Sequence, residues 1–408
     1  MARPRCLAPF STSPIRVWSS ERTAWRSARP SSSTRRSSSA TRHADDTLVS
    51  LAGGSRAGID YPIIQGPFGG GLSSTTVVAE VSNLGGLGSF GAQGLAPDRI
   101  REIVADIRQR TARPFAVNLW VSTEDAGASE VTAEAFDAAL ALLRPFYAEL
   151  GVEPPNYAPR SRVRFEDQVE VLLALRVPAF SFVCGVPDSA VLKAARARHI
   201  VTIGTASTAD EAQALEAADV DLVVASGSEA GGHRPSFLRP AEASLTGTFA
   251  LVPQVVDRVR IPVIAAGGIA DGRTVAAALT LGAQGVQVGT AFLACEESNA
   301  VPGHRAALFA PGREQTLLTR GFSGRLARGL RNRLAEELAQ SSRSLPYPWP
   351  SELLAPLRTA ALARHRVDLV SLWAGQATPL VRHRRARDLF AALVEETKVN
   401  LARDVSTP

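Results

Sequence analysis

The chain has 408 residues with a formal net charge of +6, and 45% of them are hydrophobic, so a large core is available. No apolar run approaches the ~20 residues of a membrane-spanning helix. The three cysteines are scattered and form no CxxC pair, which favours a reducing, cytoplasmic location. Their spacing also argues against a cysteine-based metal site. The basic residues are nearly all arginine and gather at the chain ends, so no nucleic-acid partner is expected.

Residues 1–46 differ from the rest of the chain. They are rich in serine and arginine and show no sustained periodicity. We expect a disordered tail or a mis-assigned start. An organelle transit peptide, which has a similar composition, is the alternative.

From residue 61 onward, short apolar runs alternate with amphipathic segments. The runs predict strands buried on both faces, centred near residues 62, 87, 116, 181, 201, 223, 263 and 286. The segments between them predict helices, including 73–84, 96–110, 165–175, 188–198 and 208–217. This alternation predicts an α/β fold, a TIM (β/α)8 barrel over 47–300, rather than an open doubly wound sheet.

Two segments exceed the standard barrel. An excursion at 121–164, with a helix at 130–151, is longer than an ordinary connection, and we expect it to cover part of the barrel mouth. Residues 301–408 are expected to be mostly helical and to pack against the barrel.

The stretch Ile261–Thr290 shows strand, glycine turn, helix, strand and a second glycine turn. Gly267-Gly268 and Gly289-Thr290 would leave the ends of neighbouring strands. Backbone without a Cβ can approach a phosphate there, and the helix that follows, with Asp271 as its N-cap, would supply free N–H groups. The loops after strands 7 and 8 are a usual phosphate site in such barrels. Ordinary turns are the alternative.

His233 lies in Glu229-Ala-Gly-Gly-His233, directly after a predicted strand. Histidine accepts a proton near neutral pH, so it is the candidate base, and the glycines before it would let a planar ligand approach. A loop histidine bonded to backbone is the alternative. Glu229 is expected to be a structural carboxylate. Asn118, near the end of another strand, either faces the mouth or caps a turn. No group of residues at metal-ligand spacing is evident near His233.

Several segments together match a known family in order. They run from about residue 60 to 395 and include YPIIQGPFGGG, RPFAVNLW, FSFVCGVP, GSEAGGHR, IPVIAAGGIADG, GAQGVQVGTAFLACEES, TRGFSGRLARGLRNRL and SLWAGQ. The chain resembles the nitronate monooxygenase family, formerly 2-nitropropane dioxygenase. These enzymes are FMN-dependent TIM barrels related to FMN-containing enoyl-ACP reductases. The long excursion resembles the family's class I.

The resemblance implies FMN in the barrel mouth. Its phosphate would be held by Gly267, Gly268, Gly289 and Thr290, with Gln287 and Val288 on the same strand end. Pro67, Phe68, Asn118 and Gly231 would contact the flavin, and His233 would be the catalytic base. Two positions depart from the family pattern: Ser226 replaces a usual glutamine that contacts FMN, and Phe68 replaces a usual methionine. Both put the substrate and the flavin contacts in doubt.

The expected reaction is oxidation of an alkyl nitronate by O2 to a carbonyl compound and nitrite. His233 would take the α-proton of a neutral nitroalkane or, when protonated, pair with the nitronate. The alternative is an NAD(P)H-dependent FMN reductase acting on quinones or enoyl thioesters. The sequence leaves monomer and homodimer open.

Overall fold

The computed structural model describes residues 58–158, 162–341 and 344–404, so the predicted tail at 1–46 lies outside the described residues. The eight predicted strands are all present. They are β1 Ile63–Gln65, β2 Gly88–Gly91, β3 Phe115–Trp120, β4 Ala179–Val183, β5 Val201–Ala206, β6 Leu222–Ser226, β8 Val263–Ala266 and β9 Gly285–Val288. All are parallel in the order β1-β9-β8-β6-β5-β4-β3-β2. A further bridge between Ile64 and Leu87 joins the two ends, which confirms the TIM barrel.

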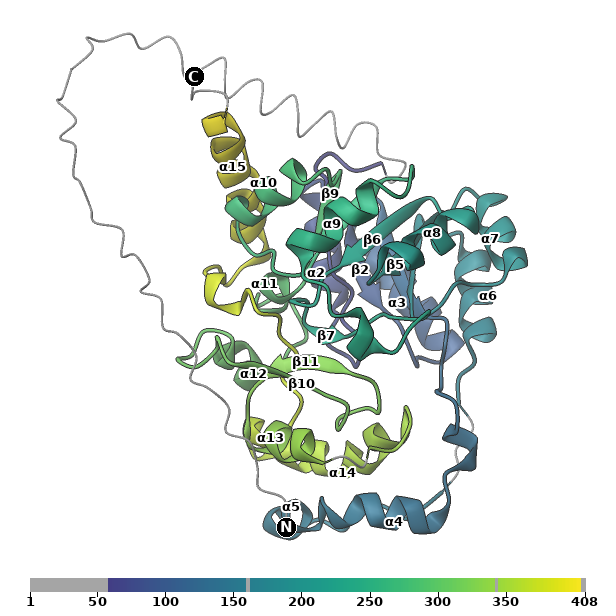
Figure 1. The fold of residues 1–408 in the computed structure, drawn as a ribbon, viewed down its shortest axis with the longest axis vertical. Coiled ribbons are helices and arrows are strands. Elements are labelled where there is room, and N and C mark those ends of the chain that lie inside the picture. The colour runs from purple at the N-terminus through teal and green to yellow at the C-terminus, as the bar shows by residue number, and fades with distance from the viewer. Residues whose placement is uncertain (1–57, 159–161, 342–343, 405–408) are drawn as a thin grey trace, which may run out of the picture. The chain divides into compact units, whose positions relative to one another are not determined.

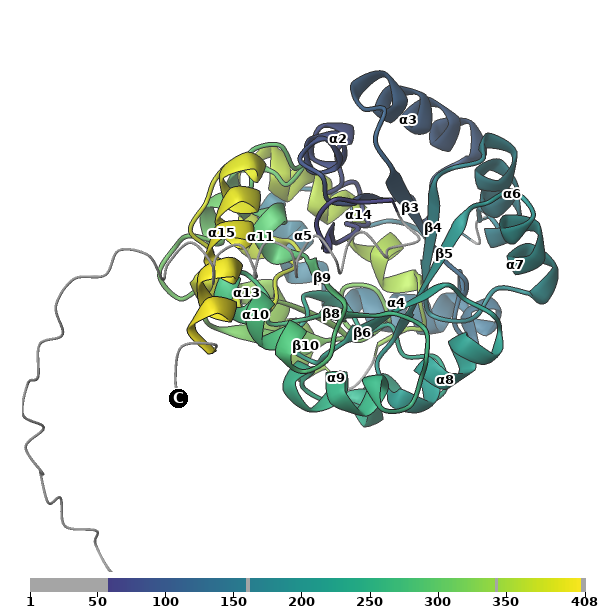
Figure 2. The same ribbon diagram turned by 90° about the horizontal axis from the view of Figure 1, so that it is seen from above.

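Helices surround this barrel (Figures 1 and 2). They are α2 Thr75–Asn83, α3 Pro97–Arg110, α6 Phe165–Leu175, α7 Ser189–Arg196, α8 Ala209–Ala217, α9 Thr248–Val256 and α10 Gly272–Thr280. Asp271 caps α10 as predicted, with a reciprocal bond from Thr274. Such a capping box fixes where the helix begins, and hence where the glycine turn before it ends.

Two hydrophobic clusters hold the barrel together. The smaller cluster includes Ile64, Leu87, Ile203, Val224 and Ile264, all buried and all from strands or the residues beside them. The larger one combines strand residues with the inner faces of the surrounding helices and of the C-terminal segments. Because side chains alternate along a strand, most strands serve both clusters, whereas β9 contributes only Val286 and Val288, to the larger one.

The excursion is not one helix. It forms η1 Ala128–Glu130, α4 Ala133–Ala141 and α5 Arg144–Leu150, so the helix predicted at 130–151 is broken. The break falls just before Pro145, at the start of α5, because proline cannot donate a backbone hydrogen bond within a helix and is tolerated only in its first turn.

The excursion supports a C-terminal helix, α14 Trp349–Ala363. The Trp349 indole donates to the Ala128 carbonyl at 2.7 Å, and its ring stacks on Tyr157 at 5.4 Å. The Tyr147 hydroxyl donates to the Leu353 carbonyl at 2.5 Å. These buried bonds join two segments that are some 200 residues apart in the sequence.

Beyond the barrel the chain is mostly helical, as predicted. It comprises α11 Thr290–Leu293, α12 Pro302–Ala307, α13 Arg333–Gln340, α14, η3 Val367–Leu369, η4 Thr378–Leu380 and α15 Ala386–Asp404. Helix α15 lies beside α10 in both ribbon views (Figures 1 and 2). No helix in the described ranges is long and apolar enough to cross a membrane.

A small antiparallel sheet was not predicted. It consists of β10 Thr316–Thr319, β11 Ala327–Leu330 and the two-residue strand β7 Gly232–His233, in the order β10-β11-β7. His233 pairs with Ala327. The histidine predicted to lie on a loop is therefore held by backbone pairing with the C-terminal segment. The 3₁₀ turn η2 Ala241–Ser244 follows it.

Candidate active site

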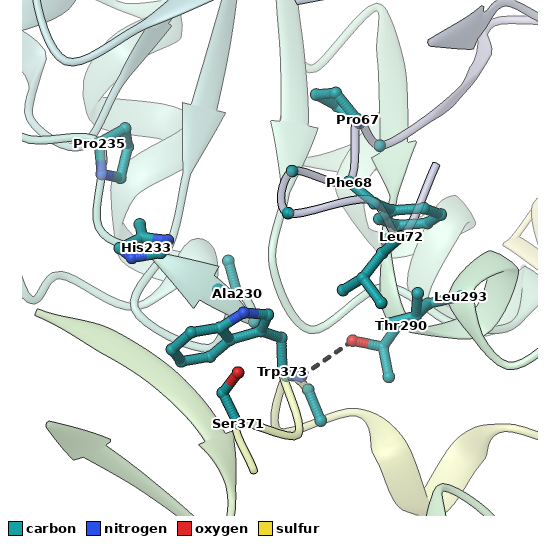
Figure 3. Close-up of a pocket in the computed structure, with 18 of the residues that line it drawn as sticks. Pro67, Phe68, Leu72, Ala230, His233, Pro235, Thr290, Leu293, Ser371 and Trp373 are labelled. Atoms are coloured by element: carbon teal, nitrogen blue, oxygen red, sulfur yellow. Dashed lines mark hydrogen bonds between the residues drawn. The ribbon is translucent and has the colours of Figure 1, made fainter. Parts of the chain in front are cut away.

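A cavity of about 320 Å³ opens at the C-terminal ends of the barrel strands. Its lining combines strand ends and loops of the barrel with residues of the C-terminal segments, including Phe322, Tyr347 and Trp373. Figure 3 shows Phe68 and Leu72 on one side and His233 with Pro235 on the other. A cleft with convergent polar groups at this end of a barrel is the usual position of an active site.

One wall is made mainly of backbone. Gly267 and Gly268 both have positive φ, 100° and 73°, a conformation that glycine adopts without steric cost. Among the described residues no protein group accepts from the backbone N–H groups of Gly268, Gly289 and Thr290. The Thr290 hydroxyl accepts from Gly375 N at 2.9 Å (dashed in Figure 3), which leaves its own proton available. Unpaired N–H groups at glycine turns form a concavity suited to an anion.

The helix behind this wall contributes fewer free N–H groups than expected. Asp271 accepts from Thr274 N at 3.0 Å, and Glu396 of α15 accepts from Gly272 N at 3.0 Å. Two N–H groups at the start of α10 are thus already bonded to carboxylates. Most of the unpaired N–H groups at this wall therefore belong to the glycine turns themselves.

The opposite wall is made of side chains around His233. Its ring lies 4.8 Å from that of Trp120 and 5.1 Å from that of Trp373. Its Nε2 lies 2.8 Å from the Ser323 hydroxyl. That hydroxyl has one proton, which it donates to the Arg325 carbonyl at 3.2 Å. We therefore assign the proton of the ring to Nε2, which donates to Ser323 and leaves Nδ1 as the acceptor.

The environment of His233 keeps its ring neutral. Burial lowers the pKa to about 3, and the positive charge of Arg325 adds to that shift. Both effects oppose the imidazolium form. At neutral pH His233 is therefore a proton acceptor, and the interpretation in which it is protonated and pairs with an anion is disfavoured.

Arg325 lies behind this wall. Its guanidinium sits over Tyr347 at 4.2 Å and over Trp120 at 5.2 Å. It also forms an ion pair with Asp125 of the excursion at 2.8 Å and donates to Ser122. Its side chain is 10% exposed, so these interactions are shielded from water and from salt. Arg325 thus fixes the two rings relative to each other and to the excursion.

Glu229 is a structural carboxylate, as expected. It accepts from the Thr248 N–H at 2.9 Å. The Thr248 hydroxyl lies 2.9 Å from both the Glu229 carboxylate and the Gly267 carbonyl and donates its one proton to either of them. The histidine loop is thereby tied to the glycine wall.

Gly231 also has a protein neighbour that was not predicted. A Cβ there would lie 2.6 Å from the backbone of Ala374 and Gly375. The missing side chain therefore lets the C-terminal segment approach the loop, and the predicted approach of a planar ligand at Gly231 stays a prediction.

The structure brings together all but one of the predicted site residues. Those that line the cavity are Pro67, Phe68, Asn118, Ser226, Gly231, His233, Gly267, Gly268, Gln287, Gly289 and Thr290. Asn118 faces the cavity and donates to Ser181 at 3.0 Å, so it does not cap a turn. Val288 is the exception, because its side chain is fully buried in the core and only its carbonyl, which accepts from Gly66 N at 2.9 Å, is at this strand end.

Other lining residues were missed by the sequence analysis. They are mainly Trp120, Ser323, Tyr347, Trp373 and Arg358. Three of them lie in segments quoted for the family resemblance, RPFAVNLW, TRGFSGRLARGLRNRL and SLWAGQ, which is the signal that could have identified them.

The excursion contributes none of its described residues to the cavity lining. It acts on the site from behind, through α14 and Arg325. Among the described residues no group of three or more histidine, cysteine, aspartate or glutamate side chains could hold a metal ion.

Comparison with known proteins gives consistent matches. A family model described as nitronate monooxygenase matches residues 55–396. A probable nitronate monooxygenase from Staphylococcus aureus (strain MRSA252) is 40% identical over 342 residues, covering 83% of this chain and 94% of that protein.

Two solved structures are also similar to this chain. A nitroalkane oxidase from Streptomyces ansochromogenes is similar with a TM-score of 0.77 and 34% identity, covering 88% of this chain and all of that one. FabK from Thermotoga maritima follows with a TM-score of 0.67 and 27% identity, covering 88% of this chain and 97% of that one.

Proposed function

Because this chain belongs to the nitronate monooxygenase family, a family of flavin-dependent oxidoreductases, we propose that it uses FMN and O2 to convert alkyl nitronates, and the nitroalkanes that give rise to them, to carbonyl compounds and nitrite. The observation that carries this proposal is the placement of a neutral His233 and a glycine-lined anion site in one cavity.

The residues present fit FMN. The unpaired N–H groups of Gly268, Gly289 and Thr290 and the Thr290 hydroxyl would hold the phosphate. Pro67, Phe68, Asn118 and Gln287 would lie along the flavin, with Ser226 nearby. Ser226 and Phe68 are 7% and 8% exposed, so the two departures from the family pattern lie within the packed floor of the site. When bound, FMN supplies the redox chemistry of the reaction with O2.

His233 would remove the α-proton of a neutral nitroalkane through Nδ1. Its Nε2–H stays bonded to Ser323 throughout, which keeps the ring in one tautomer and orientation. A low pKa makes the free imidazole a weak base, but the negative charge that develops on the adjacent nitro group favours the imidazolium as the proton arrives. The rings of Trp120 and Trp373, which pack against His233, would shield this transfer from water.

Two measurements test the proposal. The purified protein should contain FMN, and in air it should release nitrite from a nitroalkane and faster from the preformed nitronate, without NAD(P)H. The second measurement is the anaerobic visible spectrum before and after NADH or NADPH is added. A flavin band that persists supports the monooxygenase, whereas rapid bleaching with no nitrite release would favour the reductase alternative.

The remaining expectations stay proposals. We propose that the enzyme is cytoplasmic and that its partners are a small-molecule nitronate and O2. We also propose that it is a monomer or a homodimer.

A further inference from the structure

Tyr347 brings a hydroxyl to the histidine side of the cavity. It lines the cavity and is 6% exposed. Its ring lies 5.4 Å from that of Trp120, and the Trp120 ring lies 4.8 Å from that of His233. The phenol is therefore separated from the proposed proton acceptor by a single aromatic ring.

The phenol oxygen already accepts one hydrogen bond. Gln93, which also lines the cavity, donates to it through Nε2 in the assigned orientation of the amide. A phenol has one proton and can accept through its oxygen, so this bond leaves the proton of Tyr347 to be donated. Among the described residues no protein group accepts that proton. Because buried tyrosine hydroxyls usually find a partner, the free proton points to an acceptor on a ligand in the cavity.

The loop that carries Gln93 is held from behind. Gln168 of α6 is fully buried, and its amide donates to the Ala92 and Leu95 carbonyls at 3.0 and 2.8 Å. These two carbonyls lie on either side of Gln93 in the sequence, so its side chain starts from a fixed backbone. Fixed donors stabilise a developing charge effectively, because they need no rearrangement during the reaction.

Arg325 polarises the phenol. Its guanidinium lies over the Tyr347 ring at 4.2 Å, and its ion-pair partner Asp125 donates from its backbone N–H to the Tyr347 carbonyl at 3.1 Å. Burial raises the pKa of Tyr347 to about 12, against the opposing effects of Arg325 and of the bond from Gln93. The hydroxyl thus keeps its proton at neutral pH, while the nearby positive charge makes it a stronger hydrogen-bond donor.

We propose that Tyr347 is a second catalytic residue, which donates a hydrogen bond to a nitro oxygen of the substrate while His233 removes the α-proton. This inference rests on the proposed function and deepens it. The C–H bond breaks and its proton goes to Nδ1 of His233, its electron pair forms the C=N bond, and the negative charge moves to the nitro oxygens. The proton of Tyr347 is not transferred, and its role is to stabilise that charge. One nitroalkane can make both contacts, because only two bonds separate its α-carbon from its nitro oxygens.

The test is Tyr347→Phe in the full-length, FMN-loaded protein, because phenylalanine keeps the ring beside Arg325 and removes only the hydroxyl. For a neutral nitroalkane, kcat should fall by about ten- to a hundredfold with little change in KM, because the charge develops only as the proton leaves. The preformed nitronate carries the charge when it binds, so its KM should rise by about tenfold while its kcat is largely retained. A tyrosine ring that only packs would not produce this difference between kcat and KM.

Two further variants show whether the hydroxyl itself acts on the substrate. The matched control is Tyr157→Phe, since the Tyr157 hydroxyl donates to the Val131 carbonyl at 2.8 Å and lies outside the described cavity lining. Both substrates should then behave as with the wild type. Gln93→Leu keeps the Tyr347 hydroxyl but removes the bond that orients it, so kcat for nitroalkanes should fall by only about threefold. An equal loss in Gln93→Leu and Tyr347→Phe would show that the hydroxyl acts only through Gln93, and would overturn the inference.

The outcomes separate this inference from the proposed function. If the wild type releases no nitrite from nitronates or nitroalkanes, the proposed function fails and this inference fails with it. If nitrite is released and Tyr347→Phe changes neither kcat for the nitroalkane nor KM for the nitronate, Tyr347 is not catalytic while the function stands. A loss of kcat by the same factor for both substrates, together with a loss of bound FMN, would assign Tyr347 a structural role and overturn the inference. If Tyr347→Phe does not fold, Gln93→Leu decides, because a nitroalkane kcat equal to that of the wild type would then overturn the inference.

Discussion

The two walls of the cavity are built in different ways. The glycine wall is backbone, and its main residues lie within one stretch from Gly267 to Thr290. The histidine wall is made of side chains from segments as far apart as Trp120 and Trp373, and it is held together by Arg325. The first wall follows from local sequence, whereas the second exists only once distant segments have packed. Substitutions should therefore affect the two walls in different measurements.

The largest effect on turnover is expected for His233→Asn, which removes the proton acceptor from the histidine wall. Turnover of neutral nitroalkanes should fall by about 10²- to 10⁴-fold, the usual contribution of a general base. Turnover of preformed nitronates should persist in part, because no proton is removed from them. Nitrite release from both substrates measures the difference. Nitroalkane turnover equal to that of the wild type would exclude His233 as the base.

A smaller loss is expected when the support of that wall is changed. Arg325→Lys keeps the positive charge but loses the planar group that lies over Tyr347 and Trp120, and Arg325→Gln loses the charge as well. Both should lower kcat/KM for nitroalkanes by about ten- to a hundredfold, because the rings around His233 shift. Only Arg325→Gln should raise the pKa seen in the pH–rate profile, since it alone removes a positive charge near the imidazole.

The control for the two Arg325 variants is Arg331→Gln, which breaks an exposed ion pair with Glu336 just beyond β11. It should change neither kcat/KM for nitroalkanes nor the pKa in the pH–rate profile. An identical pH profile in Arg325→Lys and Arg325→Gln would show that Arg325 has no electrostatic effect on His233.

The glycine wall can be tested by a substitution that leaves the stability of the protein nearly unchanged. A Cβ added at Gly289 would meet no protein atom within 4 Å, and its φ of −98° is negative, so the residue does not need the left-handed conformation that favours glycine. Gly289→Ala should therefore leave the melting temperature nearly unchanged but weaken FMN binding by about tenfold, because the methyl group would occupy the approach of the phosphate. FMN titration and thermal unfolding of the FMN-free protein measure the two effects. Unchanged FMN affinity would move the phosphate away from this turn.

The smallest effect concerns stability in acid. His304 is 2% exposed, bonds the Trp373 carbonyl at 3.1 Å, and burial lowers its pKa to about 4 from 6.5. The unfolded chain therefore binds a proton that the folded chain does not, and the free energy of unfolding should fall as the pH falls from about 6.5 to 4.

Urea unfolding across this range measures the slope. In His304→Gln the free energy of unfolding should depend less steeply on pH, and the remaining dependence should include the contribution of His233. An equally steep dependence in that variant would assign the acid sensitivity to other groups.

The contrast between the glycine wall and the histidine wall also explains which features could be predicted from the sequence. The eight strands were evident because parallel strands buried on both faces are mostly apolar, and Gly267-Gly268 marked a turn because positive φ leaves few other choices. Asp271 was recognisable as an N-cap because capping is local. Each of these features depends on neighbours in the sequence.

The features that were missed depend on distant residues. The strand Gly232–His233 has too few residues to show an alternation and exists only through pairing with Ala327 and Arg328. Nothing local indicates that Glu396 would bind the start of α10, or that Arg325 would reach Trp120. The predicted helix at 130–151 was an error of local reading, because Pro145 marked its break.

The pairing of β1 with β9, with Ile63 opposite Val286, has a consequence for synthesis on the ribosome. The first strand must wait for more than two hundred later residues before its partner emerges, and the ring cannot close earlier. Trp373 joins His233 later still. A growing chain would thus complete its glycine wall before His233 is enclosed, and under the proposed function the cofactor would be captured by a protein that is not yet able to react.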